Sequence, residues 1–133
     1  MVTRNLPALA ALLAASLLLA ACGGPPDTSL PAEPVAELSE QEQQGKRLFS
    51  QYCGACHSIV GEATIVGPAM AGSATRAETR IEGMSAQDYL IESILDPGAY
   101  LVDGFDNLMP TTWGTSLTGE EMDAIIAFML TLK

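Results

Sequence analysis

The chain has 133 residues, of which sixteen are acidic and six are basic, so its formal net charge is −10 at pH 7. This acidity argues against nucleic acid as a ligand and against electrostatic binding to anionic lipid, because both require clustered Lys and Arg. It favours association with a positively charged face of a partner protein.

The N-terminal segment is typical of an export signal. An almost wholly apolar run from Leu6 to Ala21 follows Arg4 and Asn5. This run is shorter than the roughly 20 residues that a membrane-spanning helix needs, so it predicts a signal peptide over residues 1–21. Leu19-Ala20-Ala21-Cys22 resembles a bacterial lipobox, which predicts a lipid on Cys22 as the first residue of the mature chain. The alternative is an ordinary signal peptide that leaves Cys22 as an idle thiol.

Residues 22–38 combine polar side chains with four prolines: Pro25, Pro26, Pro31 and Pro34. Such a composition is typical of an extended linker, so we expect a lipid-anchored, Pro-rich tether here. Residues 39–133 are then expected to form one small folded domain, in which no internal repeat is evident.

Three patterns in this domain predict helices. Each opens with a hydroxyl side chain followed three residues later by an acidic one, and the three capping residues are Ser39, Ser85 and Thr118. We expect the first helix to run to Cys53, the second to end before Pro97-Gly98, and the third to begin after Thr118. In the third, apolar residues recur at i, i+3, i+4 and i+7, which predicts a buried face of Met122, Ile125, Ile126 and Met129.

The segment Cys53-Gly54-Ala55-Cys56-His57 is the most specific pattern in the chain. It has the C-x-x-C-H form at which c-type haem is attached. Two thiols at this spacing can form thioethers with the two vinyl groups of one porphyrin, and the imidazole that follows can ligate the iron. A structural zinc site needs four ligands, and only Cys22 remains, without a second histidine. We therefore expect one covalently attached haem c; a chance match and a small disulfide are the alternatives.

The predicted fold is all-α, with about three main helices and long loops around one covalent haem. No segment shows a convincing strand pattern, and the stretches 58–84 and 98–117 are rich in Gly, Pro and Thr. Loops of this length are uncommon in a compact domain. They are expected where two arms of the chain wrap a flat cofactor.

Several positions outside the haem motif complete a family pattern: Gly45, Phe49, Gly67, Pro68, Met109, Pro110, Ile125 and Phe128. With these positions the domain resembles the class I cytochrome c family, small all-α proteins with one haem, over nearly all of residues 39–133. The resemblance implies that the first and last helices cross closely at Gly45. It also implies that the Pro68 carbonyl accepts a hydrogen bond from the His57 imidazole.

The same resemblance implies that His57 and Met109 are the two iron ligands. Such a site would be closed to substrates, and its reduction potential would lie above that of a site with two histidines. Met84 and Met70 are the alternative ligands, and an open sixth position is a further alternative. Met122 and Met129 fit the apolar face of the last helix.

Other residues near the expected haem allow two interpretations. Three aromatic residues near Met109 either line the haem pocket or fill a small core: Tyr100, Phe105 and Trp113. Arg76 and Arg80 either pair with the haem propionates or are solvated. Otherwise residues 73–82 match no pattern that predicts a role.

The resemblance implies one-electron transfer rather than enzymatic catalysis, and we identify no catalytic residue. We expect an extracytoplasmic protein, lipid-anchored to a bacterial membrane on the periplasmic or outer face, that carries electrons between respiratory or photosynthetic complexes. Its partners would then be redox proteins rather than nucleic acid. One alternative is a fixed cytochrome subunit of a larger oxidase or quinol-oxidising complex. Another, of a different class, is a haem enzyme or gas sensor with an open distal position.

Overall fold

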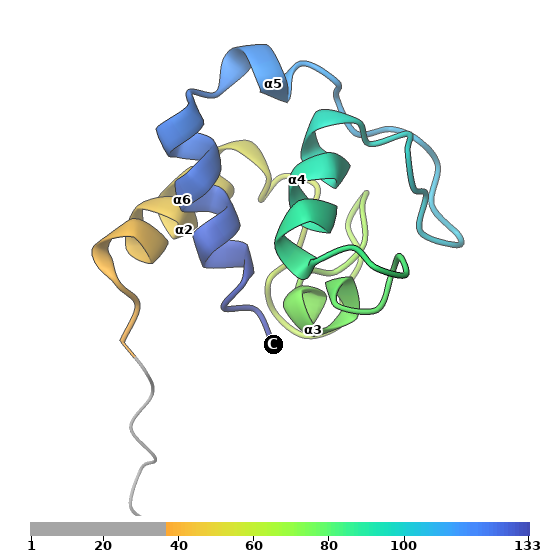
Figure 1. The fold of residues 1–133 in the computed structure, drawn as a ribbon, viewed down its shortest axis with the longest axis horizontal. Coiled ribbons are helices and arrows are strands. Elements are labelled where there is room, and N and C mark those ends of the chain that lie inside the picture. The colour runs from red at the N-terminus through yellow and green to blue at the C-terminus, as the bar shows by residue number, and fades with distance from the viewer. Residues whose placement is uncertain (1–36) are drawn as a thin grey trace, which may run out of the picture. The chain divides into compact units, whose positions relative to one another are not determined.

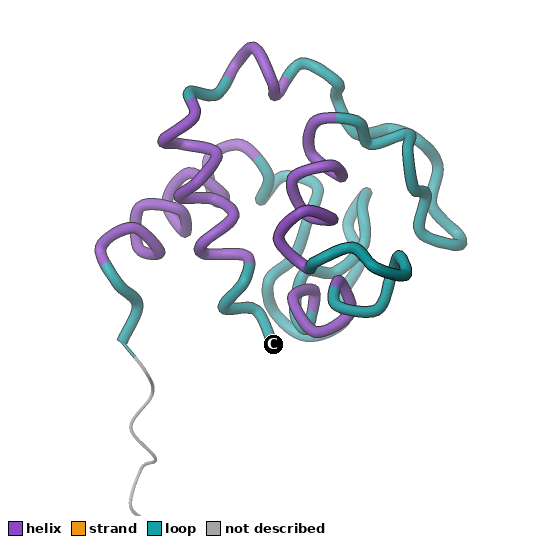
Figure 2. The backbone as a smooth tube through the Cα atoms, in the orientation of Figure 1, coloured by secondary structure: helices purple, strands orange, loops and turns teal. Residues whose placement is uncertain are grey.

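The computed structural model describes residues 37–133, so the expected signal peptide, Cys22 and nearly all of the expected tether lie outside the described residues. The described helices, in chain order, are α2 (Glu40–Tyr52), α3 (Ser73–Ala77), α4 (Ala86–Leu95), α5 (Trp113–Ser116) and α6 (Gly119–Met129). Figures 1 and 2 show these helices joined by loops, and no strand is present in residues 37–133. The all-α prediction is confirmed.

The three predicted helices begin at the predicted caps. At the start of α2, Glu42 N donates to Ser39 Oγ at 3.3 Å and Ser39 N donates to the Glu42 carboxylate at 2.6 Å. Thr118 and Glu121 form the same reciprocal pair before α6, at 3.2 and 2.9 Å. At the start of α4, Asp88 N donates to Ser85 Oγ at 3.0 Å, and it is the Ser85 hydroxyl, not the Ser85 backbone N–H, that donates to the Asp88 carboxylate, at 2.6 Å. These caps satisfy backbone N–H groups that the first helical turn leaves without partners.

Two further helices, α3 and α5, lie in stretches whose sequences had predicted loops. They have 5 and 4 residues, too short to show a helical period in the sequence. Neither has a side-chain cap, and α3 instead follows Gly72, whose φ of 71° lies in the left-handed region that glycine adopts without strain. Their formation therefore depends on the surrounding structure rather than on a local signal.

The first and last helices of the domain, α2 and α6, pack directly against each other (Figure 1). Gly45 allows the close approach, because a Cβ at this position would overlap the carbonyl oxygen of Ala124. One turn further along, the rings of Phe49 and Phe128 meet edge to face, with centroids 5.7 Å apart. The close crossing expected at Gly45 is therefore present.

The hydrophobic core extends from this crossing to α4 and to the region around α3. Its most deeply buried side chains are Phe49, Ala74, Ala77, Leu90, Ala124, Ile125, Ile126 and Phe128. Long loops connect α2 to α3 and α4 to α5 (Figure 2). The first loop begins with the haem motif, and the second contains Met109. Among residues 37–133, no helix has both the length and the apolar character needed to cross a membrane.

Candidate haem-binding site

The haem motif forms a tight turn at the end of α2. The Cys53 N–H donates to the Phe49 carbonyl oxygen at 2.8 Å and completes the last helical turn. The Cys53 carbonyl oxygen then accepts hydrogen bonds from Cys56 N and His57 N, each at 3.0 Å. The helix end and this turn bring both thiols and the imidazole to the wall of one cavity.

A second segment, from Val66 to Pro68, holds the His57 ring. Val66 N and Gly67 N donate to the Cys56 carbonyl oxygen at 3.2 and 2.9 Å, which folds this loop back onto the motif. His57 Nδ1 lies 2.8 Å from the Pro68 carbonyl oxygen. Because a carbonyl oxygen can only accept, Nδ1 carries the proton, and Nε2 is left with the lone pair that an iron ligand requires.

Gly67 is required for this arrangement. A Cβ at Gly67 would overlap the imidazole of His57 and lie 2.9 Å from each ring nitrogen. The loop backbone therefore covers one side of the ring directly and restricts its rotation. Together with the hydrogen bond to the Pro68 carbonyl oxygen, this contact orients Nε2 through protein groups alone.

The cavity itself is large and mostly apolar. Its empty volume, counted together with the solvent in its open mouth, is about 1380 Å³. Both long loops and helices α2, α3, α4, α5 and α6 contribute to its wall. Much of the apolar lining comes from Phe49, Leu90, Ile94, Val102, Phe105, Leu108 and Met129.

Three methionines line this cavity: Met70, Met109 and Met129. Met70 belongs to the loop that holds His57, and Met129 is a core residue of α6 with 5% of its surface exposed. Met109 is half-buried and reaches the cavity from the separate loop between α4 and α5. Met84, one of the alternative ligands, packs against the core but is not part of the cavity wall.

The aromatic residues near Met109 all line the cavity: Tyr100, Phe105 and Trp113. Trp113 packs against Tyr52 at the end of α2, with ring centroids 5.9 Å apart. Tyr100 meets Tyr89 of α4 edge to face at 5.8 Å. For these three residues the structure therefore supports the pocket-lining interpretation. The ring contacts of Tyr100 and Trp113 connect the loop between α4 and α5, and α5 itself, to α4 and α2.

The environment of Cys53 suits a neutral sulfur. Within residues 37–133, neither Cys53 nor Cys56 takes part in a disulfide. Burial, with a smaller contribution from the charge of Cys56, raises the pKa of the Cys53 thiol to about 11. The site thus disfavours the thiolate that a zinc site would need, whereas a thioether carries no charge. The described residues also contain no cluster of three or more His, Cys, Asp or Glu suited to a metal ion.

The structure also brings to the cavity a stretch that no sequence pattern had marked, apart from Arg76 and Arg80, for which pairing with the haem propionates was one interpretation. Ser73, Arg76, Ala77 and Arg80, from the stretch 73–82, all line the wall. Their spacing is that of one helical face, which could have been read from the sequence if a helix had been predicted there. The stretch was instead expected to be a loop.

Comparison with known protein families matches residues 42–133 to the family described as cytochrome c. This match covers more than half of the chain, and the chain therefore belongs to the cytochrome c family. A search of curated proteins gives no significant match. Members of this family bind covalently attached haem c, and the C-x-x-C-H segment with Cys53 and Cys56 is consistent with that cofactor.

The cavity fits this cofactor on three observations. Two thiols and one imidazole lie on its wall, its lining is largely apolar, and Gly67 leaves room for an oriented imidazole. A flat macrocycle with two vinyl groups and one iron ion matches this set of groups. The protein is a c-type cytochrome with an all-α fold.

Proposed function

We propose that this protein is a monohaem electron-transfer cytochrome in which Cys53 and Cys56 form the thioethers and His57 and Met109 ligate the iron. Haem supplies a metal centre that takes up and releases a single electron. The role of the chain is to hold that centre, to exclude water from it and to set its potential. We assign no catalytic residue to the protein.

The observation that carries this proposal is the convergence of His57 and Met109 on one cavity from separate segments. His57 arrives from the turn after α2, with its Nδ1 bound to the Pro68 carbonyl oxygen at 2.8 Å. Met109 arrives from the loop before α5. Met70 also lines the cavity, but it lies only two residues after Pro68, in the loop that already supports the imidazole. The haem would be held by His57 and by a second ligand from a separate segment of the chain, and Met109 suits that role better than Met70.

The residues around the motif suit electron transfer rather than reaction with a substrate. His57 is the only histidine of the chain, and its Nδ1 is already engaged. Asp106 is the one acidic residue among those that line the cavity, and its side chain is solvent-exposed. Among the described residues, the cavity wall therefore offers no buried carboxylate and no second histidine for proton transfer to a bound ligand.

We further propose that the cytochrome domain is extracytoplasmic and is held at a bacterial membrane by a lipid on Cys22, through the tether 22–38. The lipobox-like Leu19-Ala20-Ala21-Cys22 and the proline content of the tether support this arrangement. From this position the domain passes electrons between respiratory or photosynthetic complexes, either as a mobile carrier or as a subunit of a larger oxidase or quinol-oxidising complex. The formal net charge of −10 favours a positively charged docking face on its redox partners.

The function is tested by producing the full chain in a bacterium with a c-type haem maturation system. We expect a haem that remains bound after denaturation, a reversible one-electron redox titration, and the weak ferric charge-transfer absorption of methionine ligation. A chain that folds without covalent haem would contradict the proposal. A high-spin ferric spectrum with rapid CO binding would show an open iron and favour an enzyme or gas sensor. Mild-detergent purification from native membranes then separates carrier from subunit, because a subunit copurifies with its complex.

A further inference from the structure

One wall of the cavity carries a polar helical face in an otherwise apolar lining. Ser73, Arg76, Ala77 and Arg80 line the cavity at positions i, i+3, i+4 and i+7, from α3 and the turn after it. Two of the six basic residues of this acidic chain therefore face the same space. The hydroxyl oxygen of Ser73 is the one buried side-chain polar atom in residues 37–133 that has no hydrogen-bond partner.

The two arginines of this wall differ in their contacts. The Arg76 guanidinium donates to the carbonyl oxygens of Ala69 and Ala71, each at 2.7 Å. These carbonyls belong to the loop that continues from Pro68, so Arg76 stabilises the backbone behind the proximal imidazole. Its hydrogen-bonding capacity is thus partly used within the protein.

Arg80 has no such acceptor. It is half-buried, and no hydrogen bond or ion pair within residues 37–133 involves its guanidinium. Its Cζ lies 5.9 Å from the ring centroid of Tyr100, which holds it by a cation–π contact at the cavity wall. The Tyr100 hydroxyl likewise has no hydrogen-bond partner among the described residues. For a half-buried arginine beside a mostly apolar cavity, a guanidinium without an acceptor is costly, and a carboxylate is the acceptor that best completes its hydrogen bonds.

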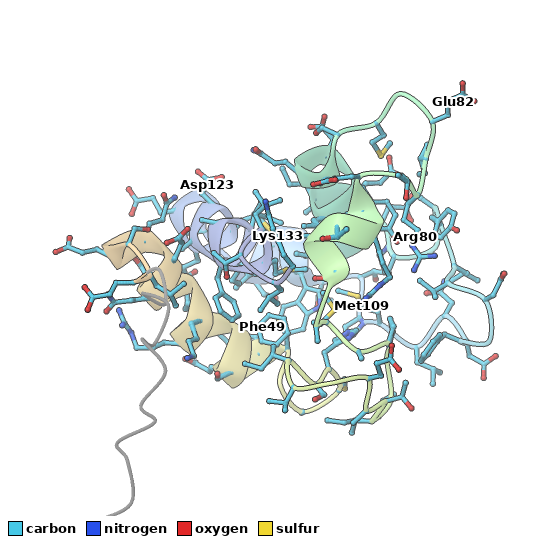
Figure 3. The ribbon with its side chains drawn as sticks, turned by 90° about the horizontal axis from the view of Figure 1, so that it is seen from below. Phe49, Arg80, Glu82, Met109, Asp123 and Lys133 are labelled. Atoms are coloured by element: carbon cyan, nitrogen blue, oxygen red, sulfur yellow. The ribbon has the colours of Figure 1, made fainter. Side chains whose placement is uncertain are left out.

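We propose that Arg80 and the Tyr100 hydroxyl together bind one propionate carboxylate of the haem. This inference rests on the proposed function, in which the haem occupies this cavity. With both vinyl groups taken by the thioethers, the propionates are the only charged groups on the haem periphery. The planar guanidinium offers two parallel N–H donors to such a carboxylate, and the only acidic side chain on the wall, Asp106, makes no ion pair with Arg80. In the view of Figure 3, Arg80 and Phe49 lie on different sides of Met109.

This contact has a consequence for the reduction potential. A positive charge beside the haem favours the ferrous state, which carries one positive charge fewer than the ferric state. Loss of the Arg80 charge should therefore lower the equilibrium constant for reduction, on the order of tenfold for one unit charge acting across a partly buried site. If Arg80 only supported the fold, its replacement would leave the vibrational bands of the haem propionates unchanged.

The test compares Arg80→Gln and Tyr100→Phe with the wild-type holoprotein, and Arg47→Gln serves as the control. Arg47 is an exposed residue of α2 that does not line the cavity, so its loss changes net charge equally without touching this wall. Three quantities are measured: covalently bound haem, the midpoint potential, and the resonance Raman bending bands of the haem propionates.

We expect normal covalent haem in Arg80→Gln, a lowered potential and shifted propionate bands, whereas Arg47→Gln leaves the bands unchanged. A smaller band shift is expected for Tyr100→Phe, which keeps the ring beneath the guanidinium and removes only the hydroxyl. Wild-type potential and bands in Arg80→Gln would overturn the inference and leave the haem assignment intact. If Arg80→Gln matures too poorly to measure, Tyr100→Phe decides, because unchanged bands there overturn the proposal. Absence of covalent haem from the wild-type chain would instead refute the proposed function.

Discussion

Replacing Gly45 by alanine should destabilise the holoprotein, although this exchange normally strengthens a helix. On helix propensity alone, alanine in the middle of α2 would gain roughly 1 kcal/mol. In the structure, however, the new Cβ would overlap the Ala124 carbonyl oxygen and lie 2.8 Å from the Phe128 Cβ. A backbone carbonyl cannot rotate out of the way, so α2 and α6 must separate. That separation also loosens the edge-to-face contact between Phe49 and Phe128.

Overpacking of this kind costs roughly 1–3 kcal/mol, and the upper part of that range applies because the obstacle is backbone. After the propensity gain is subtracted, we expect a net loss of about 2 kcal/mol, or roughly 8–16 °C in Tm for a domain of this size. The assay is thermal unfolding followed by far-ultraviolet circular dichroism. Because the haem is covalently attached, it does not dissociate when the protein unfolds, so the thermal transition reports unfolding of the chain alone.

The matched control is Gly119→Ala, at the first position of α6. A Cβ at Gly119 meets nothing within 4 Å, so this variant should have a Tm equal to that of the wild type or slightly above it. If Gly45→Ala proved as stable as Gly119→Ala, the close crossing of α2 and α6 would not be the reason for glycine at position 45.

Three further predictions concern the lipid and the haem. Cys22→Ser should release soluble holoprotein from membranes, because two acyl chains anchor far better than none; a variant that stays bound would place the anchor elsewhere. Cys53→Ser or Cys56→Ser should leave at most one thioether, shift the pyridine-haemochrome spectrum and sharply reduce the yield of holoprotein. Unchanged covalent haem in the double variant would disprove the assignment of the attachment site. Met109→Ala should lower the reduction potential, produce high-spin ferric haem and admit CO, whereas Met70→Leu should do none of these; the opposite pattern would identify Met70 as the ligand.

The main helices and the haem motif could be predicted from the sequence because their determinants act over a few residues. The caps at Ser39 and Thr118 each depend on a glutamate three positions later, so both partners are visible in one short segment. The C-x-x-C-H chemistry is similarly confined to residues 53–57. The close crossing at Gly45 was different, since it was expected only through the family resemblance. The structure supplied its physical reason, the carbonyl of Ala124.

The tertiary structure alone decided which other side chains reach the cavity. No local signal predicts α3, because it is too short for a period and begins after a glycine without a side-chain cap. Its position depends on contacts across the chain: Ala74 N donates to the Leu132 carbonyl oxygen at 3.0 Å, from beyond the end of α6. Such a bond joins residues far apart in the sequence and leaves no periodic pattern. It helps to fix α3 as part of the cavity wall, where Arg80 is left without an acceptor.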